Sequence, residues 1–366
     1  MLSKTSIFTF AAVLAALPVS SALAQQPQTQ QDIAITPEVR REVIATAIKK
    51  LNASYIFPET AKKMEAAIHE RDGKHEYDSI TSGRKLAQAL TEHLQEVSHD
   101  KHLRVRFSYE PVEEERENEE PTPVERENLR RQGARINFGF EKVERLQGNV
   151  GYLDLRGFYE ASVAADTVTA AMNFLSNCEA VIIDLRQNGG GDPATVALIS
   201  TYLFGPEPVH LNDLYYRPND STRQYWTLPF VPGKRLADKD VYILTSKRTF
   251  SAAEEFTYNL KNLKRATIIG ETTGGGAHPG GMERLGRNFA MFLPTGRAIN
   301  PISKTNWEGT GVSPDVPVAA DKALTVAHLS AAKKIMQKET DPQLREAFKN
   351  LVDRLERERD AGSAAK

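Results

Sequence analysis

The chain has 366 residues, of which 40% are hydrophobic and 26% are charged; this is an ordinary globular composition, long enough for two domains. The formal net charge is −1 and basic residues are scattered, which argues against nucleic acid or an anionic membrane as the main partner. The single cysteine, Cys178, excludes an intramolecular disulfide and is expected to be buried.

Residues 1–24 have the features of a signal peptide. Lys4 supplies a positive charge, residues 7–17 are apolar, and Ala22-Leu23-Ala24 is a typical cleavage site. Residues 25–35 are mostly polar and predict a disordered segment. No later apolar segment is long enough to span a membrane. The sequence therefore predicts an exported, periplasmic or secreted protein without a membrane span.

Residues 36–105 predict a small helical domain. Its first helix has clear start signals, with Thr36 as the cap, Pro37 at the first helical position and Glu38 in the first turn. Apolar residues then recur at roughly helical spacing up to Val97. Residues 106–147 are rich in glutamate and contain prolines, so we expect an acidic linker or surface helix there.

Residues 148–320 alternate between strand and helix patterns. A helix is expected over residues 163–175, and another between the strands at 241–244 and 266–269. Alternating strands and helices predict an α/β domain with a substantially parallel sheet. Residues 321–366 are again helical in pattern and predict a C-terminal helical tail. The expected strands are 150–155, 180–185, 241–244, 266–269 and 289–293.

Ser251 lies between an apolar strand, residues 241–244, and the helix that follows it. A hydroxyl at a helix start lies beside unpaired backbone N–H groups, which can hold a developing oxyanion. The same residues also fit a capping box, in which Ser251 and Glu254 satisfy each other's backbone donors. Ser251 is therefore either a helix cap or a nucleophile, and other segments have to decide between the two.

Two glycine-rich loops follow predicted strands. Residues 189–191 are three glycines at the carboxyl end of a buried strand, where α/β sheets bind ligands, although a tight turn needs glycine equally well. Residues 270–281 form the second loop, either lining a cleft or acting as a connector. Neither loop has the motif of a phosphate-binding loop.

Three polar residues outside these loops are candidates for chemistry. His99 and His102 are three residues apart, but the sequence offers no third ligand nearby, so a metal site is not expected. Glu308 lies in a third glycine-containing segment, near the end of the α/β region, and could equally be an ordinary loop residue. No G-x-S-x-G motif is present, which disfavours the common α/β-hydrolase interpretation.

Four segments of the chain, given in chain order at the end of this paragraph, together resemble the motifs of the C-terminal processing (tail-specific) serine proteases. The segment at residues 99–105 is similar to the branch of that family that includes interphotoreceptor retinoid-binding protein and the tricorn core protease. The similarity covers nearly all of the predicted mature chain. The four segments are Asp184-Leu185-Arg186-Gln187-Asn188-Gly189-Gly190-Gly191, Thr249-Phe250-Ser251-Ala252-Ala253-Glu254, Gly270-Glu271-Thr272-Thr273-Gly274-Gly275 and Glu308-Gly309-Thr310-Gly311-Val312-Ser313-Pro314-Asp315.

The resemblance implies a ClpP/crotonase-like α/β core and hydrolysis of peptide bonds in a peptide or protein substrate. By position, Ser251 is similar to the nucleophile, and the N–H groups of Gly190 and Ala252 would form the oxyanion hole. The choice among the three glycines 189–191 stays open by one residue. No metal and no organic cofactor is implied.

The sequence also departs from the family pattern. The glycine-rich loop at 274–276 has no lysine, so a Ser/Lys dyad cannot operate there. The histidine-containing branch implies instead His102 as general base, oriented by Glu308, with His99 as the alternative base. Residues 106–147 are too short for a PDZ-like module. A non-catalytic protein that binds an apolar ligand on the same scaffold remains the alternative function.

Overall fold

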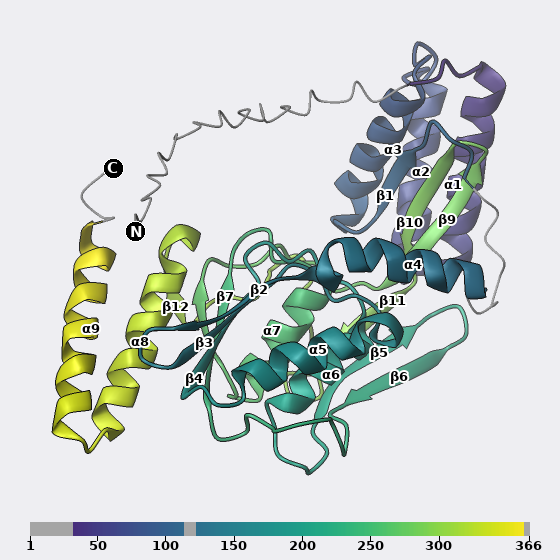
Figure 1. Ribbon diagram of the computed structural model, residues 1–366. Helices are drawn as coiled ribbons and strands as arrows, with labels where there is room; N and C mark the ends of the chain where they lie inside the picture. The colour runs from purple at the N-terminus through teal and green to yellow at the C-terminus, as the bar shows by residue number, and fades with distance from the viewer. Residues whose placement is uncertain (1–31, 113–121, 362–366) are drawn as a thin grey trace, which may run out of the picture.

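The computed structural model describes residues 32–112 and 122–361 (Figure 1). Its centre is a six-stranded sheet in the order β12-β8-β7-β4-β3-β2, in which β2 alone is antiparallel to its neighbour. The α/β fold with a substantially parallel sheet is thus confirmed. The strands are β2 Phe140–Leu146, β3 Val150–Leu155, β4 Ala180–Asp184, β7 Asp240–Thr245, β8 Thr267–Gly270 and β12 Val316–Pro317.

Helices cover both faces of this sheet because alternate strand residues point to opposite sides. Val181 and Ile183 of β4 pack in one core cluster with α5, α6 and α7, whereas Ala180 and Ile182 pack in another with α8. A further helix, α9, packs on α8 through Leu351 and Leu355. The helices are α5 Ala161–Leu175, α6 Pro193–Tyr202, α7 Ala252–Asn262, α8 Ala323–Lys338 and α9 Pro342–Ala361, with a short helix η2 Ala320–Lys322 before α8.

The N-terminal helices pack against a small sheet that the later part of the chain supplies. That sheet has the order β1-β10-β9, and Figure 1 shows it beside α1, α2 and α3. The predicted strand at 289–293 therefore forms as β10, but outside the parallel sheet of the α/β core. The helices and strands of this unit are α1 Pro37–Ser54, α2 Pro58–Gly73, α3 Gly83–Ser98, β1 Arg104–Phe107, β9 Gly280–Gly286 and β10 Phe289–Pro294.

Two predicted segments differ from their structure. Within the segment 25–35 predicted to be disordered, residues 32–35 are ordered: the Ile35 N–H donates to the Thr81 carbonyl at 2.8 Å, and the Ile35 side chain is buried. Residues 106–147 contain not only a surface helix, α4 Pro123–Arg135, and a short helix η1 Asn137–Gly139, but also β2 of the central sheet. Because β2 is the antiparallel edge strand of the central sheet, it needs no continuous apolar run.

A third sheet, β11-β5-β6, completes the fold; its strands are β5 His210–Tyr216, β6 Ser221–Trp226 and β11 Gly296–Ile299. Cys178 is buried, as predicted. Across the ranges 32–112 and 122–361, none of the helices is long and apolar enough to cross a membrane. The predicted signal peptide, residues 1–24, lies outside the described residues.

Candidate active site

A cavity of about 490 Å³ contains Ser251 and two histidines, His102 and His278. Its lining comes from segments that are far apart in the sequence, among them the turn before β1, the glycine loop after β4, the start of α7, the loop before β9, and the strands β5 and β11. The cavity therefore exists only where the N-terminal unit meets the α/β core.

Ser251 occupies an unusual backbone conformation at the start of α7. Its φ is 56° and its ψ is −123°, a region that residues with a Cβ rarely adopt. Such a conformation costs about 1–3 kcal/mol and persists where the surrounding structure holds it, commonly at functional sites. β7 ends at Thr245 and α7 begins at Ala252, so the turn places the serine at the helix N-terminus, as the sequence indicates.

Ser251 can cap α7 and still leave its hydroxyl available for other contacts. Ser251 and Glu254 form a capping box, and the Glu254 carboxylate accepts the Ser251 N–H at 2.9 Å. The serine half is the weaker one, since the Ser251 side chain makes no capping hydrogen bond of ordinary geometry. The Ser251 hydroxyl is therefore not committed to the cap.

Glu254 also holds the glycine loop that forms one wall of the cavity. Its buried carboxylate accepts the Gly275 N–H at 2.6 Å, the Gly276 N–H at 2.9 Å and the Thr273 hydroxyl at 2.5 Å. Burial raises the pKa of Glu254, while these hydrogen bonds act against that rise. One carboxylate thus ties the turn that carries Ser251 to the loop that carries His278.

We predict that Glu254→Ala lowers the free energy of unfolding by at least about 3 kcal/mol. It removes the acceptor of four donors, and a buried donor left without a partner costs about 1–3 kcal/mol. Urea unfolding measures the loss, and hydrogen exchange at Gly275 and Gly276 localises it. The exposed Glu179→Ala is the control; equal stability of both variants would contradict this role for Glu254.

Among the three glycines 189–191, the structure distinguishes Gly190 from Gly191 by the direction and partner of the backbone N–H. The Gly190 N–H already donates to Asn188 Oδ1 at 2.8 Å, and Gly190 does not line the cavity, whereas Gly191 does. The Gly190 carbonyl accepts from the Phe158 N–H, so the Gly191 N–H, on the other side of the same peptide plane, points away from Phe158. Gly191 and Ala252 are therefore the better-placed pair of N–H donors.

His102 lies close to the turn that carries Ser251. Its ring packs 4.5 Å from the ring of Phe250, the residue before Ser251, and 5.6 Å from that of Phe292. Burial lowers the pKa of His102 to about 4, so the ring is neutral and able to accept a proton at neutral pH. Its Nδ1 is buried without a hydrogen-bond partner.

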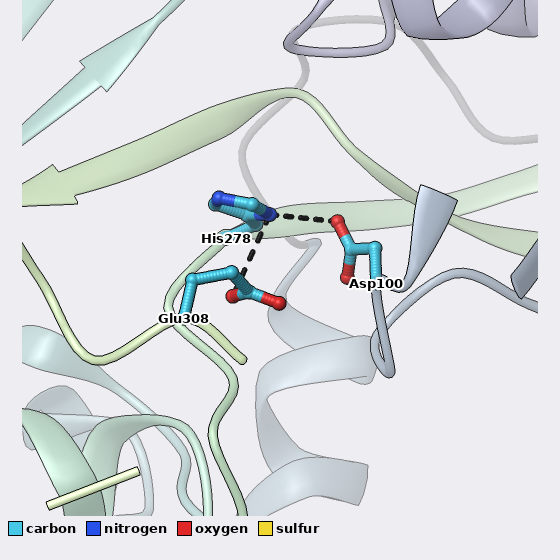
Figure 2. Close-up of side chains that lie close together, drawn as sticks. All are labelled: Asp100, His278 and Glu308. Carbon is cyan, nitrogen blue, oxygen red and sulfur yellow. Dashed lines mark hydrogen bonds and ion pairs between the residues drawn. The ribbon is translucent and has the colours of Figure 1, made fainter. Parts of the chain in front are cut away.

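Glu308 contacts His278 rather than His102. Figure 2 shows His278 Nδ1 facing both carboxylates, 2.7 Å from Asp100 Oδ2 and 3.5 Å from Glu308 Oε2, with its other ring nitrogen pointing away from them. Burial raises the pKa of Glu308 to about 7, and Glu308 Oε1 has no hydrogen-bond partner. The predicted His102–Glu308 hydrogen bond is therefore not formed in this structure. His99 ends α3 with a positive φ and does not line the cavity.

Sequence reasoning missed Asp100 and His278. Asp100 is fully buried, and its carboxylate accepts the His102 N–H at 3.0 Å and the Tyr55 hydroxyl at 3.2 Å. The sequence signal that could have identified His278 is its position inside the second glycine-rich loop, residues 270–281. The ligand atoms of Asp100, His278 and Glu308 all lie within 4.8 Å of one another, close enough to hold a metal ion. The 2.7 Å contact between His278 and Asp100 is equally that of a hydrogen-bonded pair.

Comparison with known proteins gives two family matches. Residues 149–318 match the model of peptidase family S41, and residues 27–140 match that of the N-terminal domain of peptidase S41 in eukaryotic IRBP. The second match agrees with the branch that the sequence resembles.

Individual relatives agree with these matches. The chain is 30% identical over 181 residues to a carboxy-terminal-processing protease of Bartonella bacilliformis (48% of this chain, 40% of the relative), and 29% identical over 158 residues to a tail-specific protease of Haemophilus influenzae (41% and 20%). The chain thus spans less than half the length of either. A lipoprotein structure from Streptococcus agalactiae shares the fold, with a TM-score of 0.53 and 14% identity over 82% of this chain and 98% of that one.

Proposed function

Because the chain belongs to peptidase family S41, we propose that it is a serine peptidase that hydrolyses peptide bonds with Ser251 as its nucleophile. The observation that carries the proposal is the position of Ser251. It has a strained backbone at the N-terminus of α7, and it shares one cavity with His102 and with the backbone of Gly191 and Ala252. A hydroxyl, a neutral imidazole and converging N–H groups are the parts that acyl transfer requires.

In this mechanism the Ser251 hydroxyl attacks the scissile carbonyl, and His102 accepts the hydroxyl proton. The tetrahedral oxyanion receives hydrogen bonds from the N–H groups of Ala252 and Gly191. His102 then gives its proton to the departing amine, which leaves an acyl ester on Ser251. Water hydrolyses this ester in a second round, with His102 again acting first as base and then as acid.

We propose that Glu308 orients His102 during this cycle. His102 Nδ1 and Glu308 Oε1 are both buried and lack partners, so a hydrogen bond formed between them on substrate binding would satisfy both atoms at once. Catalytic hydrogen bonds are often loose in a substrate-free enzyme and tighten on binding. His278 is the second candidate for the base, since its Nδ1 already has a carboxylate partner in Asp100.

We also propose that the protein is exported, with cleavage after Ala24. The proposal rests on the charge at Lys4, the apolar residues 7–17 and the Ala22-Leu23-Ala24 site. The test is the N-terminus of the protein isolated from a bacterial host that produces the full chain. A periplasmic or secreted form starting at Gln25 is expected, and a cytoplasmic form that keeps residue 1 would contradict the proposal.

The test of peptidase activity is the appearance of new N-termini. Purified protein is incubated with denatured casein, beside Ser251→Ala, and the products are identified by mass spectrometry. Fragments formed by the wild-type protein and absent with the variant are expected. If both proteins leave casein and a mixed peptide library intact, while the wild-type protein retains an apolar ligand, the alternative binding function is favoured instead.

A further inference from the structure

One acidic residue, Glu255, lines the cavity near Ser251. Glu255 lies on the first turn of α7, four residues after Ser251, and both residues line the cavity. Its neighbour Glu254 is used to hold the glycine loop. Glu255 has no such role, and neither the helix cap nor the proposed acyl transfer involves it.

Glu255 is buried without a compensating charge. The residue is 3% exposed, and its Oε1 atom has no hydrogen-bond partner. Burial raises its pKa to about 8, and no lysine or arginine is among the groups that shift this pKa. The cavity does contain three exposed cations, Lys101, Arg104 and Arg106, but none of them acts on Glu255. A buried carboxylate without a partner is costly, so a ligand that supplies a positive charge would be favoured.

The surroundings of Glu255 contain further unpartnered polar atoms. The side-chain amides of Asn212 and Asn259 lower the pKa of Glu255 as hydrogen-bonding neighbours, yet both amide atoms of Asn212 and the Nδ2 atom of Asn259 lack a hydrogen bond of ordinary geometry. Asn212 is fully buried on β5, and Asn259 lies one further turn along α7. Two amides and a carboxyl group thus form one unsatisfied polar cluster.

The walls beside this cluster are mainly apolar. Leu214 and Tyr216 follow Asn212 at every second position of β5, and so lie on the same face of the strand. Both line the cavity, as do Pro193 and Ala298, and Ala298 is paired with Leu214 across the sheet. Apolar walls beside a buried acidic group suit a side chain with a long apolar stem and a cationic end.

We propose that Glu255 is the recognition group of a specificity pocket that binds a lysine or arginine side chain of the substrate. Because only about one turn of α7 separates Ser251 from Glu255, the bound lysine or arginine belongs to the substrate residue whose carbonyl Ser251 attacks. The assignment rests on the proposed peptidase function. On binding, the carboxyl group of Glu255 gives up its proton and pairs with the cation, while the amides of Asn212 and Asn259 contribute hydrogen bonds.

A binding experiment tests the pocket without requiring catalysis. Benzamidine, a cation with an apolar ring, and benzamide, its neutral counterpart, are titrated into the full mature protein by calorimetry near pH 7. We expect benzamidine to bind at least tenfold more tightly, with release of a proton that appears as a buffer-dependent heat. Glu255→Gln should remove this preference, whereas the exposed Glu179→Gln should retain it. Equal binding of the two ligands, or an unchanged preference in Glu255→Gln, would overturn the proposal.

A second experiment separates failure of the pocket from failure of the peptidase function. Peptidyl diphenyl phosphonates phosphonylate an activated serine with release of phenol, and here they carry either lysine or norleucine next to the phosphorus. We expect the lysine probe to label the wild-type protein at least tenfold faster, and Glu255→Gln to label at similar rates with both. If the lysine and norleucine probes label the wild-type protein at equal rates, the specificity pocket is refuted but the peptidase function is not. Selective benzamidine binding without labelling by any probe refutes the peptidase function while leaving a cation pocket.

Discussion

Replacing Ser251 by alanine is expected to abolish casein cleavage, with a loss of at least about 10³-fold, because no other group of the cavity replaces the nucleophile. The variant should still fold, since alanine removes one oxygen and keeps the Cβ that Ser251 already accommodates at positive φ. Cleavage is followed by mass spectrometry and folding by circular dichroism. Undiminished cleavage by a folded Ser251→Ala protein would refute the assignment of the nucleophile.

The strain at Ser251 gives this prediction a stability control. Ser251→Gly should be as inactive as Ser251→Ala, yet more stable by about 1 kcal/mol, since glycine adopts a φ of 56° without steric cost. Glycine is also a better helix N-cap than alanine, which stabilises Ser251→Gly further. Urea unfolding therefore measures the sum of the two effects on the free energy of unfolding. Equal stability of the two variants would show that the turn is not strained.

The two histidines of the cavity are expected to differ in their effect on activity. His102→Asn should slow acylation of Ser251 by about 10²–10⁴-fold, the usual contribution of a general base. His278→Asn should slow it only about tenfold, the equivalent of one lost hydrogen-bonded positioning partner. The rate of labelling by a fluorophosphonate probe measures both effects.

A buried histidine far from the cavity provides the control for these variants. His328 lies on α8, where its Nε2 pairs with the Gln147 carbonyl, and His328→Asn should leave the labelling rate unchanged. A greater loss in His278→Asn than in His102→Asn would make His278, with its Asp100 partner, the base. Glu308→Gln should slow labelling about as much as the slower of the two histidine variants. Glu308 lies beside His278 and is also the proposed orienting group of His102, so its carboxylate serves whichever histidine is the base.

The sequence predicted the parts of the fold that depend on periodicity. Apolar runs such as 180–185 and 241–244 became β4 and β7 because a strand covered on both faces needs a continuous apolar sequence. β2 was missed because it is an antiparallel edge strand with a charged sequence. Strand β10 was placed in the wrong sheet, because its pairing with β1 joins residues about 185 positions apart, and no local pattern encodes such a partner.

The site was predictable where chemistry depends on local sequence, and not where it depends on contacts across the cavity. Ser251 and the Glu254 cap follow from a strand-turn-helix pattern within a dozen residues. Spacing along the chain gives no indication that Glu308 and Asp100 both lie against His278. Those contacts depend on the packing of loops from separate segments.

The most direct measurement of the central claim is the site of fluorophosphonate labelling on the wild-type protein. The labelled protein is digested, and the modified peptide is located by mass spectrometry, with Ser251→Ala treated in parallel. A single adduct on Ser251, absent from the variant, is the predicted result. A folded wild-type protein that carries no adduct, or carries it on another residue, would contradict the assignment of Ser251 as an activated nucleophile.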